Sequence, residues 1–195
     1  MKFLTKHQYP LFYSVALMVV ACSTGCSNTA LTNERLDPVT SVTVRYSEHP
    51  LVFFRPVSGR STFAKDYVNL APVEINRSGD HQYYIWLGIS MADGDATARD
   101  EFESVIVSAD DMELQLVIKT WTTMAIGASQ PIYSKPFSTA VDAYYEVSVE
   151  QLQLLAEATE LRLHTGGGDR LTFEPWNRQE RSKAALMEFV TGPTY

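Results

Sequence analysis

The sequence predicts a mainly β domain, an antiparallel β-sandwich or open barrel with two short α-helices in the C-terminal half of the chain. Apolar and polar residues alternate in several short segments, which is typical of strands with one buried face. Turn-forming residues separate these segments at short intervals. Aromatic residues, ten Tyr, nine Phe and three Trp, add to the preference for strands. A length of 195 residues suits one such domain with a processed leader.

The first predicted strands lie in residues 41–46, where the alternation is regular, and in residues 51–54, a compact apolar run. Residues 73–77 and 82–91 form the clearest predicted hairpin, because residues 78–80 read Ser-Gly-Asp, a sequence typical of tight turns. We therefore expect these two segments to pair as antiparallel neighbours.

Two further hairpins are predicted in the second half of the chain. Residues 103–107 and 112–119 flank an Ala-Asp-Asp turn, and residues 161–164 and 170–173 flank three consecutive glycines. Between these hairpins, residues 141–149 form another predicted strand. Short turns between most neighbouring strands favour an antiparallel arrangement.

Both predicted helices follow the last isolated strand. Residues 150–158 have helical periodicity, and Ser148 precedes them as a plausible N-cap. The second helix is predicted to begin after Asn177 as N-cap, because Glu180 follows at the spacing of a capping box, and to run to about Val190. We expect both helices to pack on one edge or face of the strands.

The amino terminus has the composition of a secretory signal peptide. Lys2 and Lys6 give it a positive charge, and residues 11–21 form an apolar run that ends in small residues. This run is too short to cross a bilayer, which takes about 20 apolar residues. Residues 1–21 are therefore predicted to be a cleaved leader.

The end of the leader resembles the lipobox of bacterial lipoprotein precursors. Such a box places an aliphatic residue, a small or aliphatic residue and a small residue before the cysteine that becomes lipidated; here they are Val19, Val20, Ala21 and Cys22. The resemblance implies cleavage before Cys22, diacylglycerol on its sulfur and an acyl chain such as palmitate on the new amino terminus. Two or more acyl chains anchor a protein stably without a membrane span.

Cys26 remains the alternative lipidation site, although Ser23 then occupies the position where the lipobox has an aliphatic residue. The absence of Asp after Cys22 implies sorting to the outer membrane, with the domain in the periplasm. An ordinary cleaved secretion signal is the other interpretation of the leader. A disulfide between Cys22 and Cys26 would enclose only three residues and stabilise little. The resemblance is confined to the leader, and the remaining chain resembles no characterised family.

The domain organisation follows from this leader. Residues 22–40 lack strand and helix periodicity and are rich in small polar residues, so we expect a flexible tether. Residues 41–192 are then a single β-rich domain.

The charge of the chain argues against two classes of partner. The net charge is −7, from 16 basic and 23 acidic residues, without a cluster of Lys and Arg. Nucleic-acid binding needs such a cluster, and so does electrostatic adsorption to anionic lipid. We therefore expect no nucleic-acid partner, and membrane contact through the lipid anchor.

Two segments superficially resemble ligand-binding loops. The three glycines at 166–168 are followed by a strand and no nearby Lys, whereas a phosphate loop precedes a helix, so we expect a hairpin tip. The acidic segment 93–101 has its Gly at the second position of a calcium loop and Ser104 at the twelfth, where Glu is required. We expect an exposed acidic loop there.

The sequence predicts no metal site, cofactor or catalytic residue. The histidines of the mature chain, His49, His81 and His164, lie in unrelated segments without ligand spacing. An enzyme would require distant titratable residues to converge in a cleft, for example His81 or His164 beside Asp93 or Glu103.

The sequence therefore favours a protein that acts by binding, as an accessory or adaptor subunit of an envelope assembly with an envelope protein as partner. The outward members of the tyrosine pairs, Tyr83 and Tyr144, together with Trp176, are the candidate interaction surface. The alternative is a small-ligand or glycan binder, which predicts a concave, tyrosine-rich pocket.

Overall fold

The fold is that of a computed structural model, which describes residues 30–57, 64–92, 95–135, 139–167 and 170–192. These residues form a mainly antiparallel β structure, as the sequence predicts. Ten strands make up one sheet: β1 (Thr32–Leu36), β2 (Thr43–Ser47), β3 (Leu51–Pro56), β4 (Lys65–Arg77), β5 (Asp80–Ser90), β6 (Ser104–Ala109), β7 (Met112–Val117), β8 (Val141–Val147), β9 (Leu161–Thr165) and β10 (Thr172–Pro175). The helices are α2 (Asp95–Glu101), α3 (Val149–Glu157), α4 (Glu180–Thr191) and the 3₁₀ helix η2 (Thr123–Ile126).

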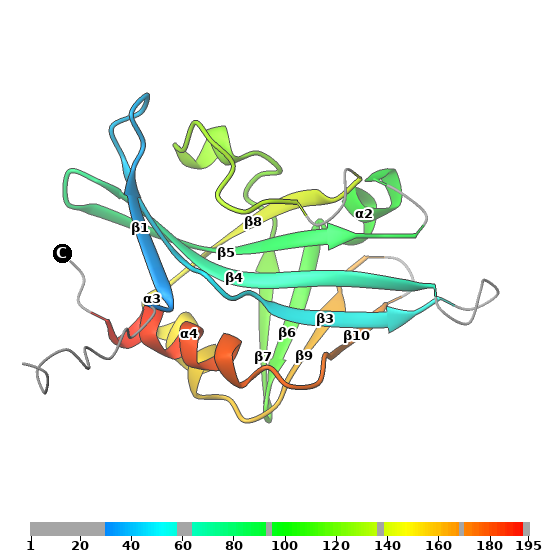
Figure 1. The fold of residues 1–195 in the computed structure, drawn as a ribbon. Helices are drawn as coiled ribbons and strands as arrows, with labels where there is room; N and C mark the ends of the chain where they lie inside the picture. The colour runs from blue at the N-terminus through cyan, green and yellow to red at the C-terminus, as the bar shows by residue number, and fades with distance from the viewer. Residues whose placement is uncertain (1–29, 58–63, 93–94, 136–138, 168–169, 193–195) are drawn as a thin grey trace, which may run out of the picture. The chain divides into compact units, whose positions relative to one another are not determined.

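The strand order is β1-β2-β4-β3-β10-β9-β6-β7, and β5 pairs with both β4 and β8 (Figure 1). Strand β4 is central because it is 13 residues long and pairs with two strands in succession along one edge. Its first half pairs with β3 and its second half with β2, while β5 covers the other edge. The length of β4 therefore joins two groups of strands into one sheet.

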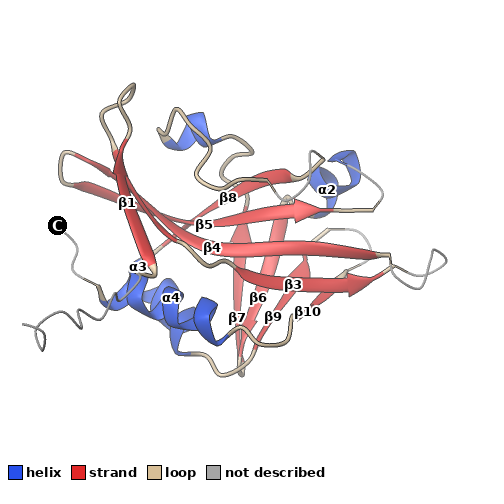
Figure 2. Cartoon of the chain, in the orientation of Figure 1, coloured by secondary structure: helices blue, strands red, loops and turns tan. Residues whose placement is uncertain are grey.

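The sheet curls (Figure 2), and the chain beyond β7 approaches β8. Beyond β7, the N–H of Lys119 donates to the carbonyl of Tyr144 in β8 at 2.8 Å. The N–H of Tyr144 donates back to the carbonyl of Thr120 at 2.9 Å. This single bridge connects the segment after β7 to β8 and leaves β1 as an open end of the half-barrel sheet.

The concave side of the sheet holds the larger hydrophobic core. Strand residues such as Phe53, Leu87 and Leu163 are fully buried there. Helices α3 and α4 pack against each other and contribute Leu152 and Phe189, among others, to the same core. Apolar residues at helical spacing on both helices therefore close one side of the half-barrel.

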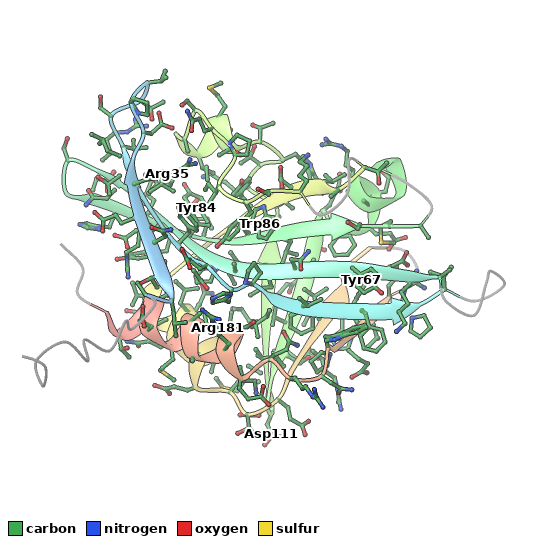
Figure 3. All side chains as sticks on the ribbon, viewed as in Figure 1. Arg35, Tyr67, Tyr84, Trp86, Asp111 and Arg181 are labelled. Atoms are coloured by element: carbon green, nitrogen blue, oxygen red, sulfur yellow. The ribbon has the colours of Figure 1, made fainter. Side chains whose placement is uncertain are left out.

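A second core lies on the opposite face of β4 and β5. There the segment that contains η2 covers Tyr144, Tyr84 and Trp86, the last two of which Figure 3 labels. Tyr133 stacks on Trp86 at 4.1 Å between ring centroids. Residues 84–89 of β5 are consequently buried on both faces. This explains why the sequence of β5 is continuously apolar there instead of alternating.

The three predicted hairpins are confirmed as β4–β5, β6–β7 and β9–β10. In the first turn, Ser78 and Gly79 both have positive φ angles, 53° and 94°, as a tight hairpin turn requires. Strand β4 begins earlier than the predicted segment, at Lys65. Of the glycine-rich tip between β9 and β10, residues 168 and 169 lie outside the described residues.

The prediction of a flexible tether over residues 22–40 is wrong for its last part. Residues Thr32–Leu36 form β1, which pairs with β2 over five residue pairs. The start of β1 is also held from far along the chain, because the backbone N–H groups of Leu31 and Thr32 donate to the Glu188 carboxylate at 3.0 and 3.1 Å. Because these partners are far away in the sequence, residues 32–36 show no strand periodicity of their own. Residues 22–29 lie outside the description.

The helix predictions are confirmed in part. Ser148 caps α3, and Gln151 completes a capping box with it. Helix α4 begins at Glu180 with Gln179, and not Asn177, at the N-cap position. The segment 93–101, predicted to be an acidic loop, contains the additional short helix α2.

Asp37, in the turn between β1 and β2, is a buried carboxylate. Its oxygens accept hydrogen bonds from the N–H groups of Val39 and Thr40 at 3.0 and 3.1 Å. Ser129 donates its N–H at 2.6 Å and its hydroxyl at 2.7 Å. Burial alone raises the pKa of Asp37, but the hydrogen bonds from Ser129, Thr40 and Val39 outweigh burial and hold this pKa well below its ordinary value.

This lowered pKa predicts an acid-dependent contribution to stability. In the unfolded chain the Asp37 carboxyl has a pKa of about 3.9. The ionised Asp37 therefore stabilises the folded state above that pH, and this stabilisation is lost as the pH falls toward the lower pKa of the folded state. We expect Asp37→Asn to be less stable at neutral pH and to lose less stability than wild type below about pH 4, as measured by urea unfolding across pH. Ser129→Ala, which removes one donor, should give an intermediate pH dependence. Equal pH dependence of wild type and Asp37→Asn would contradict this assignment.

Candidate functional site

The structure separates the three residues predicted to form an interaction surface. Trp176 is 42% exposed, Tyr83 is half-buried against the larger core, and Tyr144 is buried. The prediction that Tyr144 points outward is wrong, because the η2 segment covers that face of β8 and the Tyr144 hydroxyl lies 3.0 Å from that of Thr123. Alternation along β8 therefore places Tyr144 in the second core and Tyr145 in the first.

Tyr83 and Trp176 also lie far apart. Trp176 lies beside Tyr67, which pairs with Ser90, and Ser90 is seven residues from Tyr83 along β5. Seven residues of extended strand span about 23 Å. The two side chains therefore do not belong to one contact surface.

Trp176 belongs to a different cluster, which we call the aromatic patch: Phe54, Lys65, Tyr67 and Trp176. The Trp176 ring centroid lies 5.2 Å from that of Phe54, edge to face, and 6.0 Å from that of Tyr67. The Lys65 ammonium lies 4.6 Å from the Phe54 ring and 4.7 Å from the Trp176 ring. The patch thus combines apolar rings with a positive charge held over them.

Strand register assembles the aromatic patch. Phe54 of β3 lies directly opposite Tyr67 of β4. Lys65 lies two positions before Tyr67 on β4, so both side chains are on the same face. Trp176 joins them because its backbone N–H donates to the carbonyl of Val52 at 2.8 Å, and this hydrogen bond extends the pairing of β10 with β3. Sequence reasoning missed Lys65 and Tyr67 because it assigned no strand to the first half of β4.

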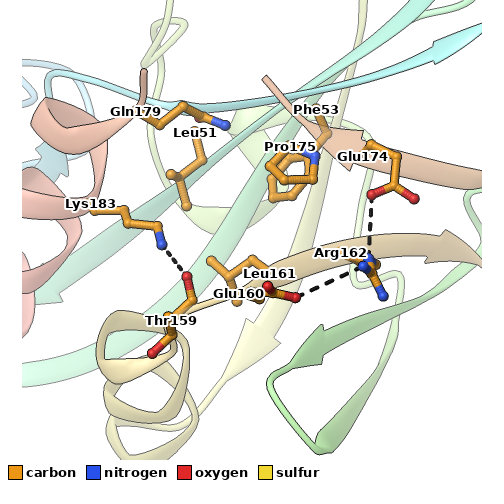
Figure 4. Close-up of a pocket in the computed structure, with 10 residues that line it drawn as sticks. All are labelled: Leu51, Phe53, Thr159, Glu160, Leu161, Arg162, Glu174, Pro175, Gln179 and Lys183. Atoms are coloured by element: carbon orange, nitrogen blue, oxygen red, sulfur yellow. Dashed lines mark hydrogen bonds and ion pairs between the residues drawn. The ribbon is translucent and has the colours of Figure 1, made fainter. Parts of the chain in front are cut away.

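A cleft with a volume of about 220 Å³ lies where β3, β9, β10 and α4 meet (Figure 4). Its floor is apolar, with Leu51, Phe53, Leu161 and Pro175. The rim is charged and polar: Thr159, Glu160, Arg162, Glu174, Gln179 and Lys183. An apolar floor inside a polar rim is the usual composition of a binding site.

The charges of the rim are balanced. Arg162 lies between two carboxylates, 3.9 Å from Glu160 and 3.3 Å from Glu174, and on the other side Lys183 donates to the carbonyl of Thr159 (Figure 4). The side chains of Arg162, Glu160 and Glu174 are each more than half exposed. Ion pairs at this exposure contribute only about 0–1 kcal/mol, so the groups are free to exchange partners with a bound molecule.

The cleft continues toward the aromatic patch. A neighbouring hollow of about 310 Å³ shares Pro175, Gln179 and Lys183 with the cleft and is also lined by Trp176. The two hollows therefore lie next to each other along the connection from β10 to α4. We refer to the cleft and this adjacent hollow together as the β10–α4 groove.

Gln179 sets the shape of this groove. Its side-chain oxygen accepts from the N–H of Val52 at 2.6 Å, and its side-chain nitrogen donates to the carbonyl of Val52 at 2.8 Å. The amide thereby takes the place of a peptide group of a neighbouring strand. This is why Gln179 occupies the N-cap position without capping α4, and why the helix begins later than the sequence predicts.

In the described part of the chain, His81 and His164 contact partners other than Glu103, the acidic residue that sequence reasoning named. His81 Nδ1 lies 2.5 Å from the buried carboxylate of Glu74, and His164 Nδ1 lies 3.0 Å from the Thr172 hydroxyl. Burial, and then the charge of Arg170, lower the pKa of His164. Asp93 lies outside the described residues.

Glu74 also binds Arg45 at 2.6 Å, so the Arg45–Glu74 ion pair and the neighbouring His81 form a charged cluster in which the Glu74 carboxylate is buried. Arg45 donates a further hydrogen bond to the carbonyl of Phe189 in α4 at 2.8 Å. None of these residues lines the β10–α4 groove. The cluster holds α4 against the sheet and is positioned to support structure.

Within the described ranges, no three His, Cys, Asp or Glu side chains are grouped so that they could hold a metal ion. None of the helices described is both long and apolar enough to cross a bilayer. Cys22 and Cys26 fall outside the described part of the chain. The chain matches no protein-family model, no curated protein and no solved structure.

Proposed function

We propose that this protein is a lipid-anchored envelope protein that acts by binding, as an accessory or adaptor subunit of an envelope assembly. The lipobox-like residues before Cys22 support the anchor and, with Ser23 after it, an outer-membrane location with the domain in the periplasm. Catalysis is not part of the proposal.

The observation that carries the binding role is the β10–α4 groove with Trp176 at its end. Trp176 is 42% exposed although the aromatic patch holds it on one side. Exposed, pre-positioned Trp residues beside an apolar depression are typical of the residues that dominate protein interfaces. Exposed acidic and basic groups around the cleft provide the polar rim that such interfaces have.

A small-ligand or glycan binder is the second candidate, and the apolar floor of the cleft favours it. However, this class predicts a concave, tyrosine-rich pocket, and the hollow beside the cleft is lined by Pro175, Trp176 and polar or charged residues without a tyrosine. The lining of the cleft also contains no tyrosine. The lining, together with the exposed Trp176, therefore favours a polypeptide partner that contacts the groove from outside.

The anchor is tested by the cysteine variants. In membrane fractions, we expect Cys22→Ala to lose the added acyl mass of the wild-type protein and to leave the protein soluble in the periplasm. Cys26→Ala is the matched control and should keep both the mass and the membrane location. Intact-mass spectrometry after fractionation reads out both properties.

If Cys26→Ala alone loses the acyl mass, the anchor is at Cys26. If neither variant changes mass or location, the leader is an ordinary secretion signal and the anchored-adaptor proposal is overturned. If Cys22→Ala behaves as expected, crosslinking in the membrane from position 176 should capture an envelope protein, with crosslinking from exposed Gln115 in β7 as control.

A further inference from the structure

Strand β1 lies at the end of the strand order, and among the described residues only β2 pairs with it (Figure 1). The hydrogen bonds at its two ends define which backbone groups face outward. The carbonyl of Leu31 accepts from the N–H of Glu48 at 2.8 Å, and the N–H of Asp37 donates to the carbonyl of Val42 at 2.8 Å. In an antiparallel pair, alternate residues bond to the partner strand, so Leu31, the two odd-numbered residues of β1 and Asp37 face β2.

The even-numbered residues of β1 consequently turn their backbone groups away from the sheet. Thr32 donates its N–H to Glu188. The N–H and carbonyl groups of Glu34 and Leu36 point to the open edge, and no hydrogen bond to them is found within the described residues. Such a row of outward groups is a template for another strand.

The edge is held rigid in its extended form. Glu188 fixes its start, as described above. In the middle, the Arg35 guanidinium donates to the carbonyls of Gln130 and Pro131 at 3.3 and 2.8 Å. At its end the buried Asp37 binds Ser129. A pre-ordered edge lowers the entropy cost of adding a strand.

The side chains of this edge specify what it can pair with. Leu36 and Val39 are 67% and 76% exposed, so they offer apolar contact area at one end. Glu34 is exposed, and no ion pair of Glu34 with the described residues is found. Glu48, near the other end, is exposed, and its carboxylate accepts a hydrogen bond from the Asn33 side chain at 2.7 Å. No ion pair of Glu48 with the described residues is found. Of the nearby cations, Arg45, opposite Glu34, binds Glu74, and Arg35 binds two carbonyls. The edge therefore offers the Glu34 carboxylate and apolar contact area to a partner.

A second copy of this chain fits the edge poorly. Two β1 strands aligned fully in antiparallel register would place Glu34 opposite Glu34. Like charges directly opposite each other destabilise strand pairs. A register centred on Asn33 would need the N–H of Thr32, which already donates to Glu188. A register centred on Arg35 would place Arg35 opposite Arg35, again a pair of like charges.

We propose that β1 binds an extended segment of a different protein as an added antiparallel strand, with Lys or Arg opposite Glu34 and an apolar side chain opposite Leu36. Main-chain hydrogen bonds would supply affinity, and these two side chains specificity. The proposal extends the adaptor function by giving the protein a second contact surface, on a different strand from the β10–α4 groove. It concerns the folded domain and does not require the lipid anchor.

The test uses the full chain in detergent and a displayed library of random octapeptides. We expect selected peptides to alternate, with a basic and an apolar residue two positions apart. On binding, amide exchange at Glu34 and Leu36 should slow. Leu36→Pro keeps an apolar side chain but removes the outward N–H, and edge strands tolerate proline. Because one main-chain hydrogen bond to the peptide is lost, we expect about tenfold weaker binding. Val39→Asn is the control for lost apolar contact alone and should retain most of the affinity.

Glu34→Lys provides a second test that does not depend on backbone tolerance. It should weaken the selected basic peptides and strengthen versions in which the basic residue is replaced by Glu. The proposal is overturned if no peptide is enriched, if enriched peptides lack the pattern, or if Leu36→Pro and Glu34→Lys bind them as wild type does. Concentration-dependent dimerisation without peptide binding would instead assign the edge to a second copy. None of these outcomes depends on how Cys22→Ala behaves, so the anchor and the strand addition fail separately.

Discussion

Trp86→Ala is expected to destabilise the fold by about 3–5 kcal/mol, the range for removing a buried aromatic side chain. Trp86 is 2% exposed and stacks on Tyr133, and its ring nitrogen donates to Asp142 at 3.1 Å. Its loss would remove the centre of the second core, to which the η2 segment is attached. The free energy of unfolding of a domain is typically about 5–15 kcal/mol, so this substitution would remove a large fraction of it.

Urea unfolding followed by circular dichroism measures this effect. Met124→Ala is the matched control, because Met124 lies on the same covering segment but is 68% exposed. It should change the free energy of unfolding by less than about 0.5 kcal/mol. A Trp86→Ala effect no larger than that of Met124→Ala would show that the second core contributes little.

Gly88 provides a further check on the same core. The Trp86 indole crosses over Gly88, and a Cβ at this position would lie 2.5 Å from a ring carbon of Trp86. Gly88→Ala should therefore cost about 1–3 kcal/mol through overpacking. In a Trp86→Leu background the same substitution should cost markedly less, because the ring is gone. Additive effects of the two changes would contradict the contact.

The second large effect is expected at the charged cluster. Glu74→Ala should destabilise the fold by about 3–5 kcal/mol, because it leaves the Arg45 guanidinium buried without its carboxylate. The Glu74 and Arg45 side chains are only 4% and 11% exposed. Arg45 also lies over the Phe189 ring at 4.2 Å, so its displacement would loosen α4 and with it the β10–α4 groove.

Glu146→Ala is the matched control for Glu74→Ala. Glu146 pairs with Lys119 at 2.8 Å, but both side chains are more than half exposed. Its removal should cost about 0–1 kcal/mol in the same urea titration. The double substitution Arg45→Met with Glu74→Leu should recover much of the loss, because no charge is then left unpaired. A double variant as unstable as Glu74→Ala would show that the packing, and not the buried charge, is responsible.

The sequence by itself determined the features that depend on neighbouring residues. The turn residues Ser78 and Gly79 specify the β4–β5 hairpin, because only certain residues adopt positive φ without strain. The cap of α3 is local as well, since Ser148 and Gln151 satisfy each other's backbone groups three residues apart. The mainly antiparallel class follows from a series of such turns. The lipobox-like leader likewise depends on consecutive residues, and its function stays a prediction.

Only the tertiary structure decided which faces of those strands are covered and which distant segments meet. Tyr144 became buried because η2 crosses its face, and the expected alternation of one inward and one outward tyrosine does not hold where both faces of a sheet are covered. Residues Thr32–Leu36 form a strand because they pair with β2 and because Glu188 binds the start of that strand. The Gln179 side chain does not cap α4 because it is hydrogen-bonded to the backbone of Val52. These outcomes depend on contacts between residues far apart in the chain, whose energies leave no periodic pattern in the local sequence. The groove and the open β1 edge arise from the same long-range contacts, which is why they became visible only in the folded chain.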